Sequence, residues 1–235
     1  MSALIILFHL IVFTIDAVSL VYDIGYIDIG HAGFGGKFKF LTIWNICLQT
    51  LYYGLSLLKD LTEEEAGPAG QARRSTLHRW RDSFLTIIAF PVGSFVVMTF
   101  WALYAIDREL VYPKRLDGII PPWLNHTLHT TVLPFLLIEK SLIYHQHPKK
   151  HVGILGSCGL ALIYLAWILF IAYYDNFWVY PVLEVLAAHE RAVFIFVCLL
   201  FFASLYILGE SITTFNWRKE LRVLRVVQIS RNKKD

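Results

Sequence analysis

Six blocks of about 20 mostly apolar residues constrain this chain more than any other feature of its sequence. At 1.5 Å per residue, a helix of that length crosses a hydrocarbon core about 30 Å thick. A segment inside a bilayer has to satisfy its own backbone hydrogen bonds, and the alternation expected of a membrane β-barrel is absent from the sequence. The sequence therefore predicts an all-α, polytopic membrane protein, a bundle of six transmembrane helices. The blocks lie near residues 3–22, 38–58, 84–106, 123–144, 153–173 and 192–212.

The composition excludes several other classes of protein. Of the 235 residues, 57% are apolar and only 17% are charged, and the mean hydropathy of +0.56 lies outside the range of soluble or disordered domains. The formal net charge is +3, and Lys and Arg lie between and after the apolar blocks, so we expect no nucleic-acid partner. Each of the three cysteines lies inside an apolar block without metal-ligand spacing, which predicts small buried side chains.

The distribution of Lys and Arg predicts the orientation of the helices. Fifteen of them lie near the C-terminal ends of the second, fourth and sixth blocks or in the segments that follow. The other six lie before these blocks or at their N-terminal ends, which is the opposite side of the membrane. Because basic loops stay in the cytosol, both termini are predicted to be cytosolic. The chain is accordingly divided into a transmembrane helical domain, residues 1–216, and a basic cytosolic tail, residues 217–235, that can lie against anionic lipid.

The first block has a second interpretation. A cleaved signal peptide would end near Ser19 and would leave five transmembrane helices. The block lacks the basic start of a signal peptide, and Asp16 interrupts the stretch that would have to be apolar. A retained first helix is therefore favoured, and the later helices keep their orientation in both cases.

Polar side chains inside apolar blocks are costly unless they find partners, so they indicate where function lies. In the block 38–58, Thr42, Asn45 and Gln49 follow one another at intervals of three and four residues. At about 100° per residue, these three side chains lie on one face of a helix, within an arc of roughly 60°.

The block 123–144 carries a similar polar face. Asn125 and His129 are one helical turn apart, and His126 lies three residues before His129, so the three cover roughly 100° of the helix surface. Pro134 removes a backbone hydrogen bond one turn further on, which predicts a kink and open space beside it.

Thr42 and His129 are the candidate catalytic pair. Both blocks start on the exoplasmic side, and the two residues lie about four and six residues inside them, at similar depths in the membrane. A threonine hydroxyl is a weak nucleophile at neutral pH, and an imidazole within hydrogen-bond reach can take its proton and return it to the leaving group. The nearest polar groups that can donate to an oxyanion are Asn45, Asn125 and His126.

Other interpretations of these residues stay open. A threonine in a membrane helix usually donates to the carbonyl four residues earlier, here that of Phe38, and a buried histidine or amide usually holds helices together. Asp16 is a candidate orienting acid for His129, but it serves equally well as a residue that holds helices together. A metal site also remains open, although His145 and His147 lie about 24 Å along the helix from His129 and cannot share its ligand shell.

Six short strings together resemble one family. They are GGKFKFLT at 35–42, FPVG at 90–93, DRELVYPK at 107–114, PPWLNHTLHTTVLPF at 121–135, WVYP at 178–181 and YILGE at 206–210. In this order and over this length, the strings resemble the androgen-induced protein family.

The resemblance implies a multi-pass membrane hydrolase that cleaves fatty acid esters of hydroxy fatty acids (FAHFA), with a threonine nucleophile and a histidine partner. These roles fall on Thr42, which ends the first string, and on His129, the second histidine of the fourth. We expect a lipid substrate, surrounding membrane lipids as partners, no cofactor and no resident metal. The expected location is the plasma membrane or the endoplasmic reticulum.

Two alternatives to this function remain. One is a non-enzymatic membrane scaffold or lipid-sensing regulator, in which the polar faces only hold the bundle together. The other is a metal-dependent intramembrane lipid hydrolase. The first predicts that substitutions on the polar faces reduce stability rather than turnover.

Overall fold

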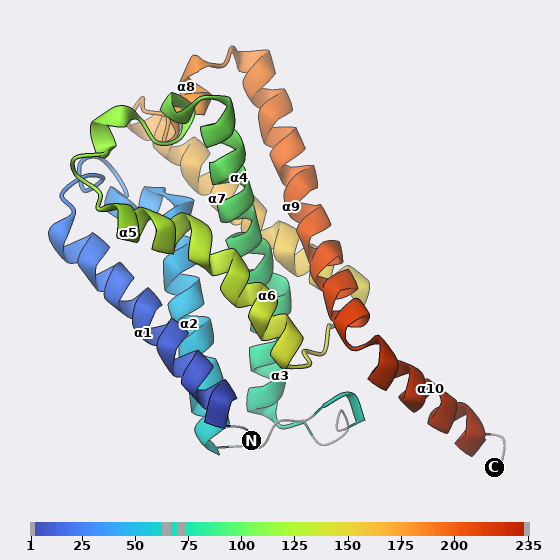
Figure 1. The fold of residues 1–235 in the computed structure, drawn as a ribbon. Coiled ribbons are helices and arrows are strands. Elements are labelled where there is room, and N and C mark those ends of the chain that lie inside the picture. Colours follow the sequence, from blue (N-terminus) through green and yellow to red (C-terminus); the bar gives the residue numbers. More distant parts are fainter. Residues whose placement is uncertain (1–2, 63–66, 70–73, 233–235) are drawn as a thin grey trace.

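The computed structural model of the chain describes residues 3–62, 67–69 and 74–232, and this part contains helices and no strand. The long helices form a bundle in which successive helices run in opposite directions (Figure 1). The prediction of an all-α fold is confirmed. Four of the long helices are uninterrupted: α1 (Ala3–Tyr26), α2 (Leu41–Thr62), α7 (Lys150–Tyr174) and α9 (Ala188–Asn216).

A further long helix contains a π-helical turn. It consists of α3 (Thr76–Ser83), the turn Phe84–Ala89 and α4 (Phe90–Ile106), which continue without a break. Pro91 is the second residue after the π-helical turn. Because proline has no N–H and its ring crowds the preceding turn, the helix cannot keep its regular bonding there, and a widened turn accommodates the loss.

The helix that carries His129 contains a second π-helical turn. It consists of α5 (Pro122–His126), the turn Thr127–Thr131 and α6 (Val132–Leu142). The sequence predicts a kink caused by Pro134. The structure instead shows a widened turn on the N-terminal side of this proline, and His129 lies inside it.

Short elements connect the long helices. The 3₁₀ turn η1 precedes α2, two further 3₁₀ turns and α8 lie at the same end of the bundle, and α10 follows α9 (Figure 1). Their bounds are η1 (Gly36–Lys39), η4 (Arg108–Leu110), η5 (Lys114–Leu116), α8 (Pro181–Val185) and α10 (Arg218–Asn232).

Four of the described helices are long and apolar enough to cross a membrane. They are α1, the continuous helix Thr76–Ile106, α7 and α9. The two remaining predicted blocks, 38–58 and 123–144, correspond to α2 and to the α5–α6 helix. These have similar lengths but carry more polar side chains, so the count of six spans stays a prediction.

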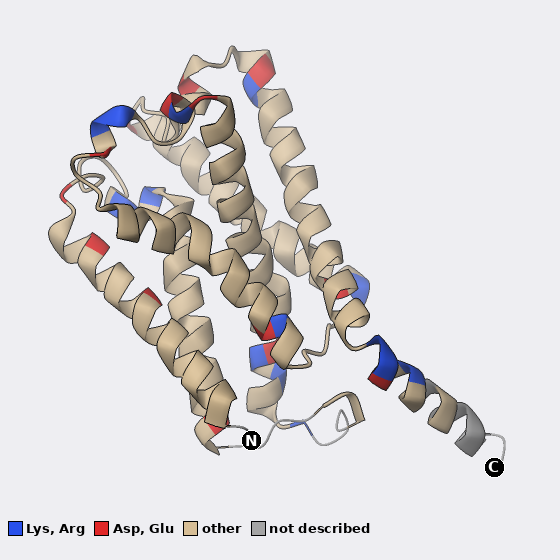
Figure 2. Cartoon of the chain, viewed as in Figure 1, with Lys and Arg blue, Asp and Glu red and all other residues tan. Residues whose placement is uncertain are grey.

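The outer surface of the bundle is apolar. Large side chains on α7 and α9, such as Ile163 at 61% and Phe196 at 61% exposure, point away from the protein. Lys, Arg, Asp and Glu gather mainly at the two ends of the bundle and in α10, and long stretches between the ends carry none (Figure 2). A lipid bilayer requires this distribution. α1 begins and α10 ends at the same end of the bundle (Figure 1).

One glycine brings three helices close together in the core. A Cβ atom at Gly93 in α4 would lie 2.7 Å from Leu136 on α6 and 2.8 Å from Gln49 on α2. Only a residue without a side chain fits this position. The close approach brings α2 and α6, which carry the polar faces, against the same part of α4.

Candidate active site

The structure brings Thr42 and His129 into direct contact. The Thr42 Oγ1 atom lies 3.1 Å from Nε2 of His129, within hydrogen-bond distance. His129 is 8% exposed, and Thr42 is half-buried in the first turn of α2. The first turn of α2 therefore faces the π-helical turn of the α5–α6 helix at this point.

The usual alternative partner for the Thr42 hydroxyl is not available. α2 begins at Leu41, so Phe38 is not part of the same helix. The carbonyl oxygen of Phe38 accepts hydrogen bonds from the indole of Trp44 at 2.7 Å and from the indole of Trp167 at 2.9 Å. The hydroxyl is therefore paired with the imidazole rather than with the backbone. Thr42 also lies nearer to its helix start than the sequence predicts, because residues 38–40 form no part of α2.

The second ring nitrogen of His129 determines which tautomer is present. Nδ1 lies 2.9 Å from the side-chain oxygen of Asn125 and 3.1 Å from the Asn125 backbone oxygen. A backbone carbonyl only accepts hydrogen bonds, so Nδ1 carries the proton. The lone pair on Nε2 then faces the Thr42 hydroxyl, as a general base requires.

Two aromatic residues on α4 hold the imidazole in place. The ring of Phe100 stacks on the ring of His129, with centroids 3.8 Å apart and planes 12° from parallel. The indole nitrogen of Trp101 donates to the backbone oxygen of His129 at 2.7 Å. The residue is thus fixed through its ring face, its backbone and Nδ1, which leaves Nε2 as the atom that faces Thr42.

A chain of hydrogen bonds fixes the start of α2. The Leu41 N–H donates to the Tyr180 hydroxyl at 2.9 Å, and the Tyr164 hydroxyl donates to the Lys39 carbonyl at 2.9 Å. The two phenols lie 2.8 Å apart, so Tyr180 donates to Tyr164. Burial raises the pKa of Tyr180, which keeps its hydroxyl protonated. Within the described chain the next amide, that of Thr42, has no hydrogen-bond acceptor.

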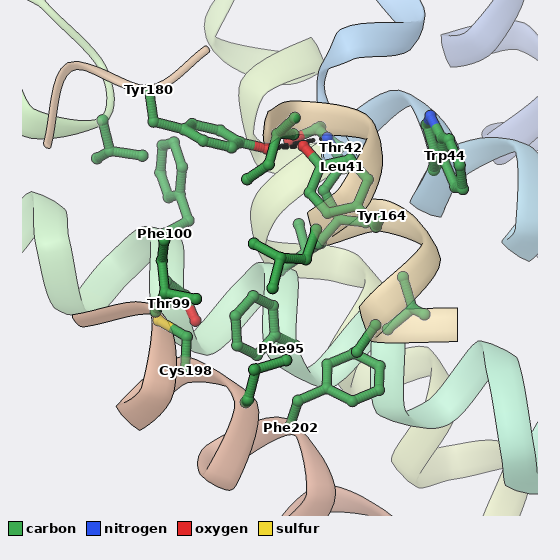
Figure 3. Close-up of a pocket in the computed structure, with 18 of the residues that line it drawn as sticks. Leu41, Thr42, Trp44, Phe95, Thr99, Phe100, Tyr164, Tyr180, Cys198 and Phe202 are labelled. Atoms are coloured by element: carbon green, nitrogen blue, oxygen red, sulfur yellow. Dashed lines mark hydrogen bonds between the residues drawn. The ribbon is translucent and has the colours of Figure 1, made fainter. Parts of the chain in front are cut away.

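An apolar cavity of about 150 Å³ lies on one side of the pair. Its walls come from α2, α4, α7 and α9, and Figure 3 shows Phe95, Phe100 and Phe202 pointing into it. Thr42 and His129 are among its few polar lining residues. We call it the apolar cavity.

A second cavity of about 590 Å³ lies on the other side of the pair, toward the loops. Its walls come from the end of α1, from η1 and from the connections around η4, η5 and α8. We call it the loop cavity. Charged side chains line it together with apolar ones; they are Asp23, Lys37, Glu109, Arg115 and Glu184. Thr42 and His129 line both cavities, so the pair lies where the two spaces meet.

The three predicted oxyanion donors take other places. Asn125 holds Nδ1 of His129 through its oxygen. His126 is exposed and lies 3.0 Å from the hydroxyl of Thr130 on its own helix. Asn45 is fully buried, accepts a hydrogen bond from Gln49 at 3.0 Å and lines neither cavity. Only Asn125 lines a cavity together with Thr42, and the role of these three residues toward an oxyanion stays a prediction.

Asp16 does not orient His129 in the structure. Its side chain is buried, and its Oδ1 atom has no hydrogen-bond partner among the described residues. The sequence placed Asp16 at the right depth, but Asn125 lies one turn before His129 on the same helix and occupies Nδ1. The side chain that contacts Nδ1 of His129 is thus an amide rather than an acid.

A buried charge cluster at the opposite end of the bundle was missed by the sequence analysis. His9 lies 2.6 Å from Asp60 and 2.8 Å from Glu139, and His145 lies 3.0 Å from Glu139 and 3.0 Å from Asp82. All five side chains are at most 2% exposed. One feature of the sequence does indicate this cluster, because the polar face of α2 continues beyond Gln49 at intervals of three and four residues. It runs through Tyr52, Ser56 and Lys59, and the Tyr52 hydroxyl donates to Glu139.

No metal site is formed by the described residues. Among them, no three histidine, cysteine, aspartate or glutamate side chains converge in a way that would hold an ion. Ion pairs and hydrogen bonds hold the charge cluster together, and His145 lies in that cluster rather than with His129.

Known proteins give an independent comparison. Residues 4–214 match the family described as FAR-17a/AIG1-like protein. The chain is 40% identical over 191 residues to the human androgen-induced gene 1 protein, with 80% of each chain covered. It is 37% identical over 183 residues to the human androgen-dependent TFPI-regulating protein, with 78% of each covered. It is 22% identical over 182 residues to the UPF0641 membrane protein PJ4664.05 of Schizosaccharomyces pombe, with 76% of each covered.

No solved structure matches the chain. The family match extends over nearly all of the helical bundle, including both halves of the Thr42–His129 site. The two human relatives share more than a third of their aligned residues with it. This chain therefore belongs to the FAR-17a/AIG1-like protein family.

Proposed function

We propose that this protein is a multi-pass membrane hydrolase that cleaves the ester bond of fatty acid esters of hydroxy fatty acids. Thr42 is the nucleophile and His129 the general base. The observation that carries the proposal is the 3.1 Å contact between Thr42 Oγ1 and a His129 ring whose other nitrogen is held by Asn125. The substrate class comes from the family resemblance, and the two cavities that meet at Thr42 suit an ester that joins two chains.

The reaction follows from the positions of the two side chains. His129 Nε2 takes the hydroxyl proton while Thr42 Oγ1 attacks the ester carbonyl carbon. The tetrahedral intermediate collapses, His129 returns the proton to the departing alkoxide, and the hydroxy fatty acid leaves. Water, activated by the same imidazole, then hydrolyses the acyl-threonine and releases the fatty acid.

The oxyanion would be stabilised by the first turn of α2. Among the described residues the Thr42 N–H has no acceptor, and the N-terminus of a helix favours negative charge. The Leu41 N–H is already paired with Tyr180, which leaves the amide of the nucleophile itself for the developing charge. Removal of a single oxyanion donor typically costs about 10²–10³-fold in kcat, so this contribution is substantial.

In this proposal the bundle crosses the membrane six times. α2 and the α5–α6 helix are then the two additional spans, and both termini lie in the cytosol because fifteen of the Lys and Arg residues fall on that side. The charge cluster lies at the cytosolic end, and Thr42 lies near the exoplasmic end. The basic helix α10 then lies at the cytosolic surface, where anionic lipid attracts it.

The test compares three variants with wild type in membranes. Thr42→Ala and His129→Ala remove the two reacting groups, and Thr50→Ala is the matched control. The Thr50 hydroxyl lies on the same helix but donates to the Ile46 carbonyl at 2.8 Å. Release of hydroxy fatty acid from a branched fatty ester is measured together with labelling by a fluorophosphonate probe and with expression.

We expect turnover and labelling to be lost in Thr42→Ala and His129→Ala at normal expression, and kept in Thr50→Ala. Turnover that persists in Thr42→Ala would contradict the nucleophile assignment, and its loss on addition of a chelator would then favour a metal-dependent hydrolase. No turnover in wild type, with both variants poorly expressed, would favour the scaffold or lipid-sensing regulator.

A further inference from the structure

Lys37 places a buried ammonium group in the wall of the loop cavity. Its Nζ atom lies 2.6 Å from the Asp23 carboxylate and 2.5 Å from the Asp23 backbone oxygen. The side chain of Lys37 is 4% exposed and that of Asp23 is 8% exposed, and both residues line the cavity. An ammonium has three donors, and Asp23 takes two of them. One donor therefore remains for a ligand in the cavity.

Three other charged residues of this cavity differ from Lys37 and Asp23 in burial. Glu109, Arg115 and Glu184 are exposed, so water screens their interactions. Lys37 lies deeper, where charge-assisted hydrogen bonds are stronger because little water competes for them. Among the cations that line the cavity, Lys37 is therefore the one suited to bind an anion tightly.

We propose that Lys37 binds the free carboxylate of the hydroxy-acid half of the substrate in the loop cavity, while the fatty acyl chain occupies the apolar cavity. The inference rests on the proposed function. The substrate is an ester of two chains, and only one of them ends in a carboxylate. The apolar cavity offers its ligand few polar groups, whereas the loop cavity offers an ammonium. With Thr42 between the cavities, this arrangement fixes which way round the ester binds.

The arrangement also gives a basis for selectivity. A neutral ester, such as a glyceride, has no group for Lys37 and would leave that donor unpaired. Lys37 and Thr42 are five residues apart, so their Cα atoms are separated by at most about 18 Å. The separation between the Lys37 ammonium and the Thr42 hydroxyl is therefore fixed. It selects hydroxy acids whose ester lies at the matching distance from the carboxylate, and so it determines the preferred branch position.

Asp23 competes with the substrate in this arrangement. Its carboxylate holds the ammonium in place but repels a second carboxylate. Replacement of Asp23 by asparagine keeps an oxygen that can accept from Lys37 and removes the negative charge. This variant is expected to lower KM for a charged substrate and to leave KM for a neutral one unchanged.

The test compares a branched ester that carries a free carboxylate with its neutral primary amide, which has nearly the same size. Release of the fatty acid is measured for the full-length protein, and kcat/KM is determined for both substrates. Wild type, Lys37→Gln, Lys37→Arg and Asp23→Asn are compared. Lys39→Gln is the matched control, because Lys39 lies in the same turn, is equally buried at 5% and donates to the Ala32 carbonyl instead.

We expect wild type to prefer the free acid by about 10- to 100-fold, the ratio that one charge-assisted hydrogen bond provides. Lys37→Gln should lose this preference and keep its turnover of the amide, whereas Lys37→Arg and Lys39→Gln should keep the preference. If Lys37→Gln does not fold, a lower KM of Asp23→Asn for the acid alone supports the proposal, and an unchanged or higher KM overturns it.

Two other outcomes also overturn the inference. One is wild type that cleaves acid and amide equally well, and the other is a well-folded Lys37→Gln that retains the preference. Failure of the proposed function looks different, because wild type would then cleave neither substrate.

Discussion

Two buried polar assemblies lie at opposite ends of the same bundle, and they differ in what surrounds them. At one end, Thr42 and His129 are neutral groups that line two cavities. At the other end, His9, Glu139 and Asp82 belong to a charge cluster whose members line neither of these cavities and bind one another. In an apolar protein, burial of polar groups is therefore not enough to indicate chemistry. The polar group that adjoins space for a substrate is the candidate for catalysis.

The largest expected effect concerns the nucleophile. Thr42→Ala should lower kcat by at least about a thousandfold, because removal of a nucleophile removes the covalent route. The melting temperature should hardly change, because the variant loses a single hydrogen bond worth about 1 kcal/mol. Turnover per folded molecule and thermal unfolding in the same preparation provide the measurement. If turnover instead fell only as much as the amount of folded protein, Thr42 would have a structural role like that of the charge cluster.

The opposite pattern is expected for the charge cluster. Glu139→Gln should reduce the free energy of unfolding by about 3–5 kcal/mol, because it leaves His9 and His145 buried without their shared carboxylate. The folded fraction should keep its kcat. Thermal unfolding is compared with that of Glu210→Gln, a half-buried glutamate near the same end of the bundle. A stable Glu139→Gln that has lost its turnover would show that the cluster takes part in the chemistry.

A smaller effect is expected for the residue that orients His129. Asn125→Leu removes the side-chain oxygen 2.9 Å from Nδ1 but leaves the backbone oxygen at 3.1 Å. Because one acceptor remains, kcat should fall by only about tenfold, the value of roughly one hydrogen bond. The kcat of Asp16→Asn is measured for comparison. If Asp16→Asn loses more kcat than Asn125→Leu, Asp16 rather than Asn125 orients His129.

The smallest effect is expected for the neighbouring histidine. His126→Gln should change kcat/KM by less than about twofold, because His126 is exposed and is paired with Thr130. Steady-state kinetics on the branched ester measure this change. A large loss would mean that His126 reaches the substrate after a rearrangement of the π-helical turn.

The sequence was sufficient to select the two residues that the structure brings together. Intervals of three and four residues placed Thr42 and His129 on the polar faces of two helices, and the block boundaries gave them similar depths. The all-α fold followed from the length of the apolar blocks. Helix periodicity and bilayer thickness determine these features, and both can be read without knowledge of side-chain packing.

Other features depended on packing and could not be predicted. Whether the Asn125 side-chain oxygen accepts from His129 depends on its rotamer and on the widened turn. Asp16 has a suitable depth, but depth does not specify the rotation of a helix about its axis. For the same reason, the contact between His9 and Glu139, from opposite halves of the chain, was not visible in the spacing of either block. Lys37 lies just before the block 38–58, and a polar residue outside an apolar block carries no signal of its own in the sequence.

The most direct test of the catalytic assignment is the identity of the residue that becomes acylated. Wild-type protein is labelled with a fluorophosphonate probe, digested, and analysed by mass spectrometry for the peptide that contains Thr42. The prediction is one adduct, on Thr42 Oγ1, that is absent when His129 is replaced by alanine. An adduct on any other residue, with Thr42 unmodified, would contradict the account.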